Sequence, residues 1–338
     1  MKTNIKSIVG TVPKETGQLR SAFSSFKSAS GPSIVEIDGK TYFIGDYAKK
    51  YSRNPVSNLS GEHFTSPEML LPLTYAALTN LPYDEPISLV VSLPIAVMLS
   101  DKASSETTNS LRSLLIGKHD FKADGVEKHI EIENIAITAQ GAAALYSDAI
   151  DINGDTQMDT ELLKEKLGVI DIGFGTLDLF TLSDLDIDAE GTTGCDLGAH
   201  FPVEELQTQI RVKYGVNLSQ EQAIDSLSGR RQYVYCDGQQ IAIKQVLDNV
   251  FDIWISEIEK MLQRHIQSGH DYAKLYFCGG GVSFISDRLK ARFPHGVVLS
   301  DPIFANAIGC YRYGKALKVK NPVGIDPGFF AYKVVVEE

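Results

Sequence analysis

Three apolar segments of this chain each run into a glycine turn, and this pattern constrains the fold more than any other feature. The segments are Val169–Asp178, Leu275–Val282 and Val323–Lys333. A glycine turn exposes successive backbone N–H groups and lets the main chain approach an anionic ligand closely. Asp171 and Asp326 stand just before two of the turns. An aspartate at the end of a strand can hold a hydrated Mg²⁺, which needs only one or two carboxylates.

A purely structural explanation of these turns stays open. Aspartate and glycine often end strands for their turn geometry alone, and a glycine triplet can simply join a strand to a helix. About one or two Asp-x-Gly triplets are expected by chance in a chain of this length. This chain has three, at Asp171–Gly173, Asp196–Gly198 and Asp326–Gly328. The informative observation is therefore the set of three strand-and-turn units together.

Segments typical of strands alternate with segments typical of helices along the chain. The Asp38-Gly39 pair predicts a tight hairpin between Ile34–Ile37 and Lys40–Ile44. Ile87–Leu93 is apolar throughout, which is typical of a strand buried on both faces. Apolar spacing and capping residues predict helices at 67–81, 110–116, 203–214, 221–227, 246–265, 284–293 and 303–317. Further strands are expected at 130–137, 169–173, 177–182, 233–235, 275–278 and 323–336. The alternation predicts an α/β protein with mixed sheets.

The length of the chain predicts two lobes. It has 338 residues, and a single hydrophobic core stops growing at about 250–300 residues. The polar, acidic stretch from Ser147 to Gly168 is the expected crossing between the lobes, because it lacks apolar periodicity and contains Asn153-Gly154.

Composition excludes several classes of function. The formal net charge is −11, and such a field repels nucleic-acid backbones, so direct nucleic-acid binding is not expected. The first residues contain no apolar segment of signal-peptide length, and the most apolar stretch, 89–99, is too short to span a membrane. The four cysteines lie far apart without a Cys-x-x-Cys pair, which favours reduced thiols in a cytoplasmic protein over disulfides or a metal site.

The motifs resemble those of the ATPase superfamily that contains actin, the seventy-kilodalton heat-shock chaperones and the sugar kinases. Within it they are most similar to the plasmid-segregation ParM proteins and archaeal actin-like proteins. The segment from Asp171 to Thr176 resembles the second phosphate motif, with Gly173 and Gly175 in its turn. The adenosine motif is resembled by Gly279, Gly280 and Gly281 together with Asn306. Gln140 resembles the glutamine that orients the attacking water in actin.

The resemblance implies a two-lobed actin-like (ribonuclease H-like) fold of the α/β class, with mixed sheets and a central nucleotide cleft. It implies that residues 1–150 and 310–338 form the first actin-like domain. Residues 151–309 would form the second domain, which carries the second phosphate and adenosine motifs.

The first phosphate motif stands in an unusual place. In the superfamily it lies near the amino terminus, whereas here the matching residues Asp326, Gly328 and Lys333 lie near the carboxyl end. The resemblance therefore implies a circular permutation, cut at the tip of the first hairpin, with the segment after Met1 as the second strand of the domain. Phe329 replaces the small or polar residue of many relatives, so it would contact phosphate through its backbone or serve only core packing.

The implied chemistry is ATP hydrolysis with ATP or ADP and Mg²⁺ as ligands. Asp326 and Asp171 would hold the hydrated metal ion, and Lys333 would neutralise phosphate charge. The glycine turns would donate N–H groups to the phosphates. Gln140 would orient water, and because a glutamine is too weak a base to take its proton, slow turnover is expected.

The resemblance further implies a homopolymeric filament whose assembly depends on the nucleotide. ParM relatives use such filaments to separate plasmids through a DNA-bound adaptor protein, and the acidic charge agrees with an adaptor rather than direct DNA contact. Three other functions of the same fold stay open: a small-molecule kinase, a chaperone-type switch and a scaffold that does not hydrolyse nucleotide. The length leaves little room for the sugar-binding insertions of a kinase or for a chaperone's substrate-binding domain.

Overall fold

The computed structural model describes residues 1–13, 31–57, 65–265 and 272–337. The chain divides into two compact units. Unit 1 contains Met1–Gln157 and Asn306–Glu338, and unit 2 contains Met158–Ala305. The chain therefore leaves unit 1 once, within the acidic stretch, and returns to it at the start of the last helix.

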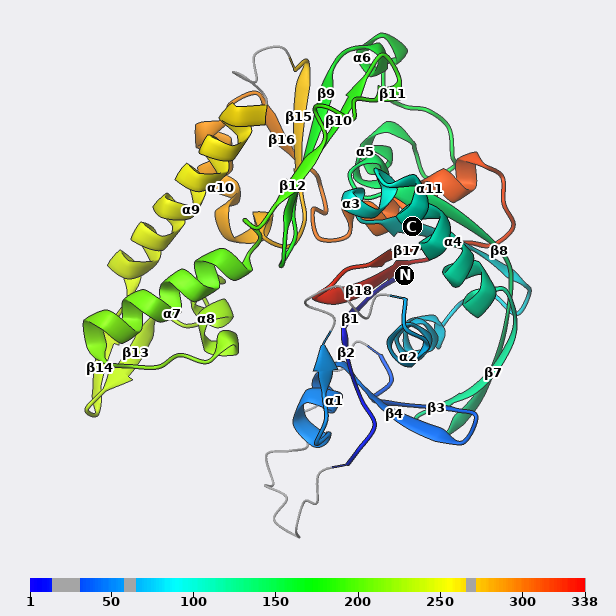
Figure 1. The fold of residues 1–338 in the computed structure, drawn as a ribbon, viewed down its shortest axis with the longest axis horizontal. Helices are drawn as coiled ribbons and strands as arrows, with labels where there is room; N and C mark the ends of the chain where they lie inside the picture. The colour runs from blue at the N-terminus through cyan, green and yellow to red at the C-terminus, as the bar shows by residue number, and fades with distance from the viewer. Residues whose placement is uncertain (14–30, 58–64, 266–271, 338) are drawn as a thin grey trace. The chain divides into compact units, whose positions relative to one another are not determined.

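Unit 1 is built on a ten-stranded mixed sheet (Figure 1). Its strand order is β1-β18-β17-β6-β8-β7-β3-β4-β2-β5. The strands are β1 (Lys2–Lys6), β2 (Ile8–Gly10), β3 (Ile34–Ile37), β4 (Lys40–Ile44), β5 (Val56–Ser57), β6 (Ile87–Leu93), β7 (Gly117–Ala123), β8 (Val126–Ala139), β17 (Pro322–Pro327) and β18 (Ala331–Val335). Only β17, β6 and β8 run parallel to one another in this sheet. All seven residues of β6 are buried, as its continuous apolar sequence predicts.

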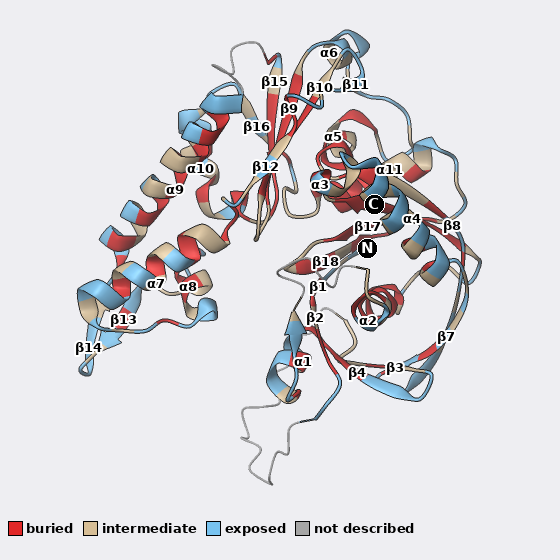
Figure 2. Cartoon of the chain, viewed as in Figure 1, coloured by how far each residue is buried: buried red, intermediate tan, exposed pale blue. Residues whose placement is uncertain are grey.

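Six of the helices in the described segments belong wholly or mainly to unit 1. They are α1 (Gly45–Tyr51), α2 (Pro67–Leu78), α3 (Ile95–Met98), α4 (Asp101–Leu115), α5 (Ala142–Ala149) and α11 (Ala305–Ala316). The predicted helix over 67–81 is confirmed as α2, with Pro67 in its first turn, although it ends three residues early. The apolar side chains of α2 and α4 pack with the sheet strands in one buried core, and Figure 2 shows buried residues concentrated on the central strands.

The helix α4 is much longer than the sequence predicts. Apolar spacing predicts a helix over 110–116, whereas α4 begins at Asp101. Its first two turns consist almost entirely of polar residues, so they carry no apolar periodicity. The helix begins there because the Ser100 hydroxyl accepts a hydrogen bond from the Ala103 N–H and thereby caps it.

The two ends of the chain form neighbouring strands, in a way that corrects one prediction. The predicted strand pair over 323–336 is confirmed as β17 and β18, which form a continuous antiparallel hairpin. The segment after Met1 is predicted as the second strand of the domain, but β18 occupies that place. Strand β1 instead pairs antiparallel with the other edge of β18, Lys2 opposite Val335. A strand can pair along two edges. Because β17 pairs with β18 on one edge and with β6 on the other, β1 pairs with the remaining edge of β18.

Unit 2 contains a second mixed sheet and a separate hairpin. The sheet has the order β11-β10-β9-β15-β16, with β12 also paired to β10. Its strands are β9 (Leu167–Ile172), β10 (Leu177–Ser183), β11 (Asp186–Ile187), β12 (Thr193–Cys195), β15 (Lys274–Cys278) and β16 (Gly296–Val298). The hairpin consists of β13 (Tyr233–Cys236) and β14 (Gln239–Ala242). Strands β9 and β15 are parallel, so Asp171 and Cys278 lie side by side near the carboxyl ends of these strands.

The described helices of unit 2 are α6 (Thr160–Lys164), α7 (His200–Tyr214), α8 (Gln220–Leu227), α9 (Lys244–His265) and α10 (Val282–Arg292). Four of them lie close to predicted positions, whereas α6 lies in the stretch predicted as a crossing without a helix. The capping box predicted at Ser219 and Gln222 is present, since each side chain bonds the other residue's backbone N–H. Trp254 of α9 lies at the centre of the unit 2 core, fully buried.

All four cysteines lie in described segments, and none of them forms a disulfide with another described cysteine. Among the described residues, no helix combines the length and the apolar character needed to cross a membrane.

Candidate functional site

The centre of the unit 1 site is the carboxylate of Asp326. It lies near the carboxyl end of β17, and the neighbouring parallel strands β6 and β8 end beside it at Leu93 and Ala139. The carboxyl ends of parallel strands are the common place for ligands in open α/β sheets. Asp326 is only 1% exposed, so its charge must be compensated by groups inside the protein.

Three side chains compensate that charge. Lys333 lies directly opposite on β18, and its Nζ is 2.7 Å from Asp326 Oδ2. The Gln140 amide donates a hydrogen bond of 2.8 Å to Asp326 Oδ1, and the Ser92 hydroxyl donates one of 3.3 Å to the same oxygen. Gln140 and Ser92 come from the ends of β8 and β6. Three strands thus bring a lysine, a glutamine and a serine onto one buried carboxylate.

The negative charge of Asp326 also affects the pKa of the buried Cys310 thiol. Burial raises the pKa of Cys310 strongly, and the Asp326 charge raises it further. The thiol therefore stays protonated and adds no charge to the site.

The turn after Asp326 is held from the other end of the sequence. The Ser7 hydroxyl donates a 2.7 Å hydrogen bond to the Gly328 carbonyl, and the Ser7 N–H donates one of 2.9 Å to the Phe330 carbonyl. A Cβ on Gly328 would lie 2.8 Å from the Ala331 carbonyl, so the turn has no room for a side chain there. Phe329 packs against the unit 1 core, as expected if its side chain serves core packing.

A second turn, at Gln140-Gly141, is fixed by Asn306. Gly141 has a positive φ of 82°, and its N–H donates a 3.2 Å hydrogen bond to Asn306 Oδ1. The Gln140 N–H donates to the Leu93 carbonyl at 2.8 Å. Asn306, which is predicted to belong with the glycine triplet, is the first residue of the returning segment of unit 1, and its side chain supports the Gln140 turn.

The unit 2 site contains two neighbouring carboxylates. Asp171, at the end of β9, lies directly opposite Asp178 on β10, and the Thr176 hydroxyl donates a 2.7 Å hydrogen bond to Asp178. Burial raises the pKa of Asp178 to about 6; the Thr176 hydrogen bond opposes this rise and the Asp171 charge adds to it. Such a shift is typical of functional sites, although structural carboxylates show it as well.

The turn after Asp171 is braced by the segment that begins α7. The Gly173 N–H donates to the Thr176 carbonyl at 2.9 Å, which closes the turn containing Gly175. The Ala199 N–H donates to the Gly173 carbonyl, also at 2.9 Å. A Cβ on Gly198 would lie 2.4 Å from the Phe174 carbonyl. This close backbone packing fixes the shape of the turn.

The glycine triplet approaches the same strand end, and its three members differ. Gly279 has a φ of +91°, and a Cβ there would lie 2.3 Å from the Ile172 carbonyl and 2.4 Å from an Asp171 carboxylate oxygen. A Cβ on Gly281 would lie 2.5 Å from the Ile172 side chain. A Cβ on Gly280 would meet nothing within 4 Å, at a negative φ. The fold therefore requires glycine at 279 and 281, whereas Gly280 leaves open backbone beside Asp171.

The structure gathers the predicted residues into two sets, one in each unit. The unit 1 set is Asp326, Gly328, Phe329, Lys333, Gln140 and Asn306, and the unit 2 set is Asp171, Gly173, Gly175, Thr176, Gly279, Gly280 and Gly281. Sequence reasoning missed two supporting residues, Ser7 and Ser92, because each reaches the site only through the fold. Asp178 stands within the strand-and-turn segment 169–178 that the sequence singles out.

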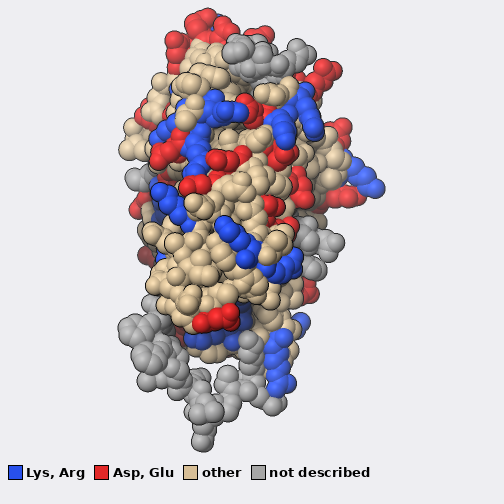
Figure 3. Space-filling model, turned by 90° about the vertical axis from the view of Figure 1, so that its left-hand side faces the viewer, with Lys and Arg blue, Asp and Glu red and all other residues tan. Residues whose placement is uncertain are grey.

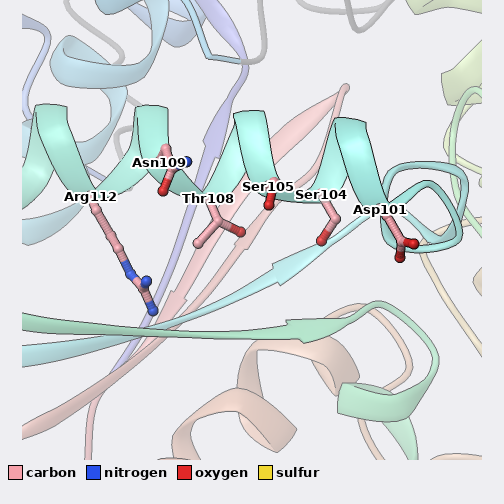
Figure 4. A pocket seen from close by; sticks show the side chains of 6 residues that line it. All are labelled: Asp101, Ser104, Ser105, Thr108, Asn109 and Arg112. Atoms are coloured by element: carbon pink, nitrogen blue, oxygen red, sulfur yellow. The ribbon is translucent and has the colours of Figure 1, made fainter.

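Two further features of the described residues concern ligand binding. No group of three or more His, Cys, Asp or Glu side chains is arranged there to hold a metal ion. A polar hollow lies along α4, lined by Asp101, Ser104, Ser105, Thr108, Asn109 and Arg112 (Figure 4). All six come from one helix, and none is a predicted site residue.

Comparison with protein families decides the identity of the fold. Residues 1–142 match the family model described as "Actin like proteins N terminal domain". Residues 169–291 match "Archaeal actin homologue MreB-like, C-terminal". Both matched segments therefore belong to actin-like families. A search of curated protein sequences found no match to the chain.

Solved structures of actin-like proteins superpose on nearly the whole chain. The archaeal actin homologue Ta0583 has a TM-score of 0.67 at 20% identity, covering 93% of this chain and 92% of that one. A ParM filament from Clostridium botulinum has a TM-score of 0.67 at 22% identity, covering 91% of each chain. Ta0583 in complex with ADP has a TM-score of 0.63 at 18% identity, covering 84% and 88%. These likenesses confirm the predicted actin-like α/β fold.

Proposed function

We propose that this actin-like protein binds ATP with Mg²⁺, hydrolyses it slowly and assembles into homopolymeric filaments. The observation that carries the proposal is the buried Asp326 network. Gln140 lies far from Asp326 and Lys333 in sequence, and the three side chains meet where the parallel strands end. A buried carboxylate, a lysine and a water-orienting amide are the groups that phosphoryl transfer to water requires.

The residues present fit a hydrated magnesium ion held mainly through its own water. Asp326 and Asp171 offer hard oxygen ligands at strand ends, and Mg²⁺ needs only one or two carboxylates besides phosphate oxygens. When bound, the ion would neutralise phosphate charge. Lys333 would contribute to the same neutralisation, and its proximity to Asp326 keeps it beside the metal-binding carboxylate. Gly175, Thr176 and Gly328 would donate to phosphate oxygens, and Phe329 would do so only through its N–H. Gly173, whose N–H closes the turn, would hold the turn in shape around the phosphates.

The open backbone at Gly280 supports nucleotide binding in unit 2. Apart from its neighbours in the chain, no atom of the described residues lies within 4 Å of a Cβ placed on this residue, and the helix α10 begins two residues later. We assign Gly279, Gly280 and Gly281 to contact with the nucleoside and its phosphates. The ADP complex of Ta0583, which shares this fold, agrees with a nucleotide ligand.

Gln140 would position the attacking water. Its amide N–H₂ group is held by Asp326, which leaves the amide oxygen as the group that can accept a hydrogen bond from water. An amide cannot take the proton from that water, so turnover is expected to be slow. Asn306 would act through the Gly141 turn as a positioning residue rather than as a nucleotide contact.

Filament assembly is proposed from the fold and from the filament structures of proteins that share it, such as the Clostridium botulinum ParM. We further propose a cytoplasmic role in separating DNA through an adaptor protein. The net charge of −11 disfavours direct contact with nucleic acid and so supports an intermediary.

We also propose that the chain is circularly permuted relative to its superfamily. Strand β17, which carries the Asp326 motif, follows α11 in sequence and lies between β18 and β6 in the sheet. The cut would lie after β18, the second strand of the domain. This place follows because β18 continues directly from β17, and β1 pairs with the other edge of β18. The two units would correspond to the two actin-like domains.

The decisive experiment for the site is the Asp171→Ala substitution. We expect the affinity for Mg-ATP and the rate of phosphate release to fall at least about tenfold, because a carboxylate beside the phosphates is lost. Calorimetric titration with Mg-ATP and a phosphate-release assay without any added acceptor measure both quantities. Release without an acceptor also separates an ATPase from a small-molecule kinase.

The matched control is Asp84→Asn, an exposed carboxylate far from both candidate turns in sequence. It should leave binding and hydrolysis unchanged. Binding and turnover by the Asp171→Ala protein equal to those of the unmodified protein would overturn the site assignment. Nucleotide binding without phosphate release by the unmodified protein would instead identify a scaffold.

A further inference from the structure

Two ends of unit 2 expose large apolar side chains. At one end, Leu185 is 58% exposed and Ile187 is 51% exposed, both around the β10–β11 turn. At the other end, Val212 is 79% exposed and Tyr235 is 60% exposed. Figure 1 shows β11 and β13–β14 at opposite ends of this unit. Clustered exposed apolar side chains mark interaction sites more often than isolated ones do.

The backbone at Leu185 gives an independent reason to expect a contact. Asp184 and Leu185 form the two-residue turn between the paired residues Ser183 and Asp186, with φ values of 51° and 67°. Glycine or asparagine normally occupies such positions, because other side chains are strained there. Packing of the Leu185 side chain does not offset this backbone strain, because the side chain is mostly exposed. Strain of this kind tends to persist where it serves a function.

The end that carries Leu185 is acidic. Asp184, Asp186 and Glu190 are exposed on or next to the turn. The Asp184 N–H donates to the Lys164 carbonyl, which places the end of α6, with the exposed Glu165, beside it. Figure 3 shows acidic side chains gathered at the top of the view, where Figure 1 has α6 and β11.

The opposite end is basic and aromatic. Tyr233 and Tyr235 lie on one face of β13, with ring centroids 5.5 Å apart, while Val234 between them is buried on the other face. Cys236 bonds the Tyr214 carbonyl at 3.3 Å, which fixes the hairpin to the last turn of α7. That turn exposes Val212 between two basic residues.

The charges and apolar groups of the two ends are complementary. The acidic end consists of Asp184, Leu185, Asp186, Ile187 and Glu190, and the basic end consists of Arg211, Val212, Lys213, Tyr233 and Tyr235. Aromatic and arginine side chains are enriched in protein interfaces, and opposite charges set their orientation.

We propose that the acidic end of one copy docks on the basic end of the next copy. Contact between two different patches is heterologous, so every docked copy still offers both free ends. Such a contact repeats without closing and builds a filament. This inference rests on the proposed assembly and names the surfaces that would carry it.

The first test removes the Leu185 side chain. The Leu185→Gly substitution keeps the turn, because glycine adopts positive φ without strain. We expect unchanged folding and nucleotide binding, but a critical concentration for ATP-dependent pelleting raised by about tenfold or more. Val126→Ala is the matched control, since Val126 is also 58% exposed beside a hairpin turn, but in unit 1. Equal pelleting of the Leu185→Gly and unmodified proteins would overturn the proposal.

The second test blocks one end at a time. An Asp184→Lys/Asp186→Lys protein lacks a working acidic end, and a Val212→Glu/Tyr235→Ser protein lacks a working basic end. Neither should form filaments alone, yet their mixture should form a one-to-one dimer in analytical ultracentrifugation, because each supplies one intact end. Absence of that dimer would contradict the docking surfaces. Failure of the unmodified protein to assemble with ATP, while the dimer forms, would instead contradict the nucleotide-driven filament.

Discussion

At the scale of single residues, the two candidate turns hold their carboxylates in different states. Asp326 is buried as an ion pair with Lys333, so its negative charge is compensated before any ligand binds. Asp178 has no such cation among its described contacts, and burial raises its pKa to about 6. Near neutral pH, ionisation of Asp178 therefore lowers the stability of the folded protein. Functional sites often retain a destabilising group of this kind because their chemistry requires it.

We predict that Asp178→Asn stabilises the protein at pH 8. The folded pKa of about 6 lies above the ordinary value of 3.8, so the stability associated with this group is present below pH 4 and is lost as the pH rises through 6. The asparagine keeps an oxygen for the Thr176 hydroxyl but carries no charge. The gain in unfolding free energy should be about 1–3 kcal/mol at pH 8.

The measurement is urea unfolding at pH 4 and pH 8. The stability difference between the two proteins should vanish at the lower pH, where the native carboxyl is protonated. A gain of the same size at both values, or a loss at pH 8, would show that the Asp178 charge is not the cause. Weaker Mg-ATP binding in the more stable variant would add a functional role for the carboxylate.

At the scale of elements, the strand-to-helix loop at 279–281 combines two demands. Gly279 is required by backbone geometry, whereas Gly280 is not required by any neighbour that the structure describes. Adjacent glycines of the triplet therefore differ in the physical reason for which glycine stands there.

Alanine substitutions should separate these causes. Gly279→Ala would force a Cβ against the Ile172 carbonyl at positive φ, so we expect a loss of about 2 kcal/mol or more in stability. Gly280→Ala should leave stability unchanged or raise it by up to about 1 kcal/mol. It should nevertheless weaken Mg-ATP binding, because the methyl group occupies the proposed ligand space. Thermal unfolding and calorimetric titration give both values; full nucleotide affinity in Gly280→Ala would remove this loop from the site.

At the scale of the whole molecule, the two ends of the chain lie side by side in the sheet of unit 1. The N-terminal amine of Met1 contacts the carbonyls of Val336 and Glu337, the latter at 2.6 Å, and β1 lies antiparallel to β18. A short linker between the ends would therefore form an ordinary hairpin connection.

We predict that a relinked chain keeps the fold and the site. A Gly-Ser linker would join Glu338 to Met1, and the chain would open between Val319 and Lys320, outside α11 and β17. Exposed connections of this kind tolerate new ends, so nucleotide affinity should stay within about threefold. The control opens the same circular chain between Val90 and Val91, within the buried strand β6, and should not fold. Loss of folding in the first protein as well would refute the proposed permutation.

The sequence alone determined the features that depend on local chemistry. Apolar runs, turn residues and caps predicted the β3–β4 hairpin, the capping box at Ser219 and the glycine turns after Asp171 and Asp326, because each arises from neighbouring residues. Tertiary structure decided what depends on strand order and register. It brought Gln140 and Ser92 to Asp326, placed Ser7 on the Gly328 turn and Asn306 on the Gly141 turn, and buried Asp178 enough to shift its pKa. These contacts join residues that are distant in sequence, and the pKa shift follows from burial, so no local pattern could reveal them.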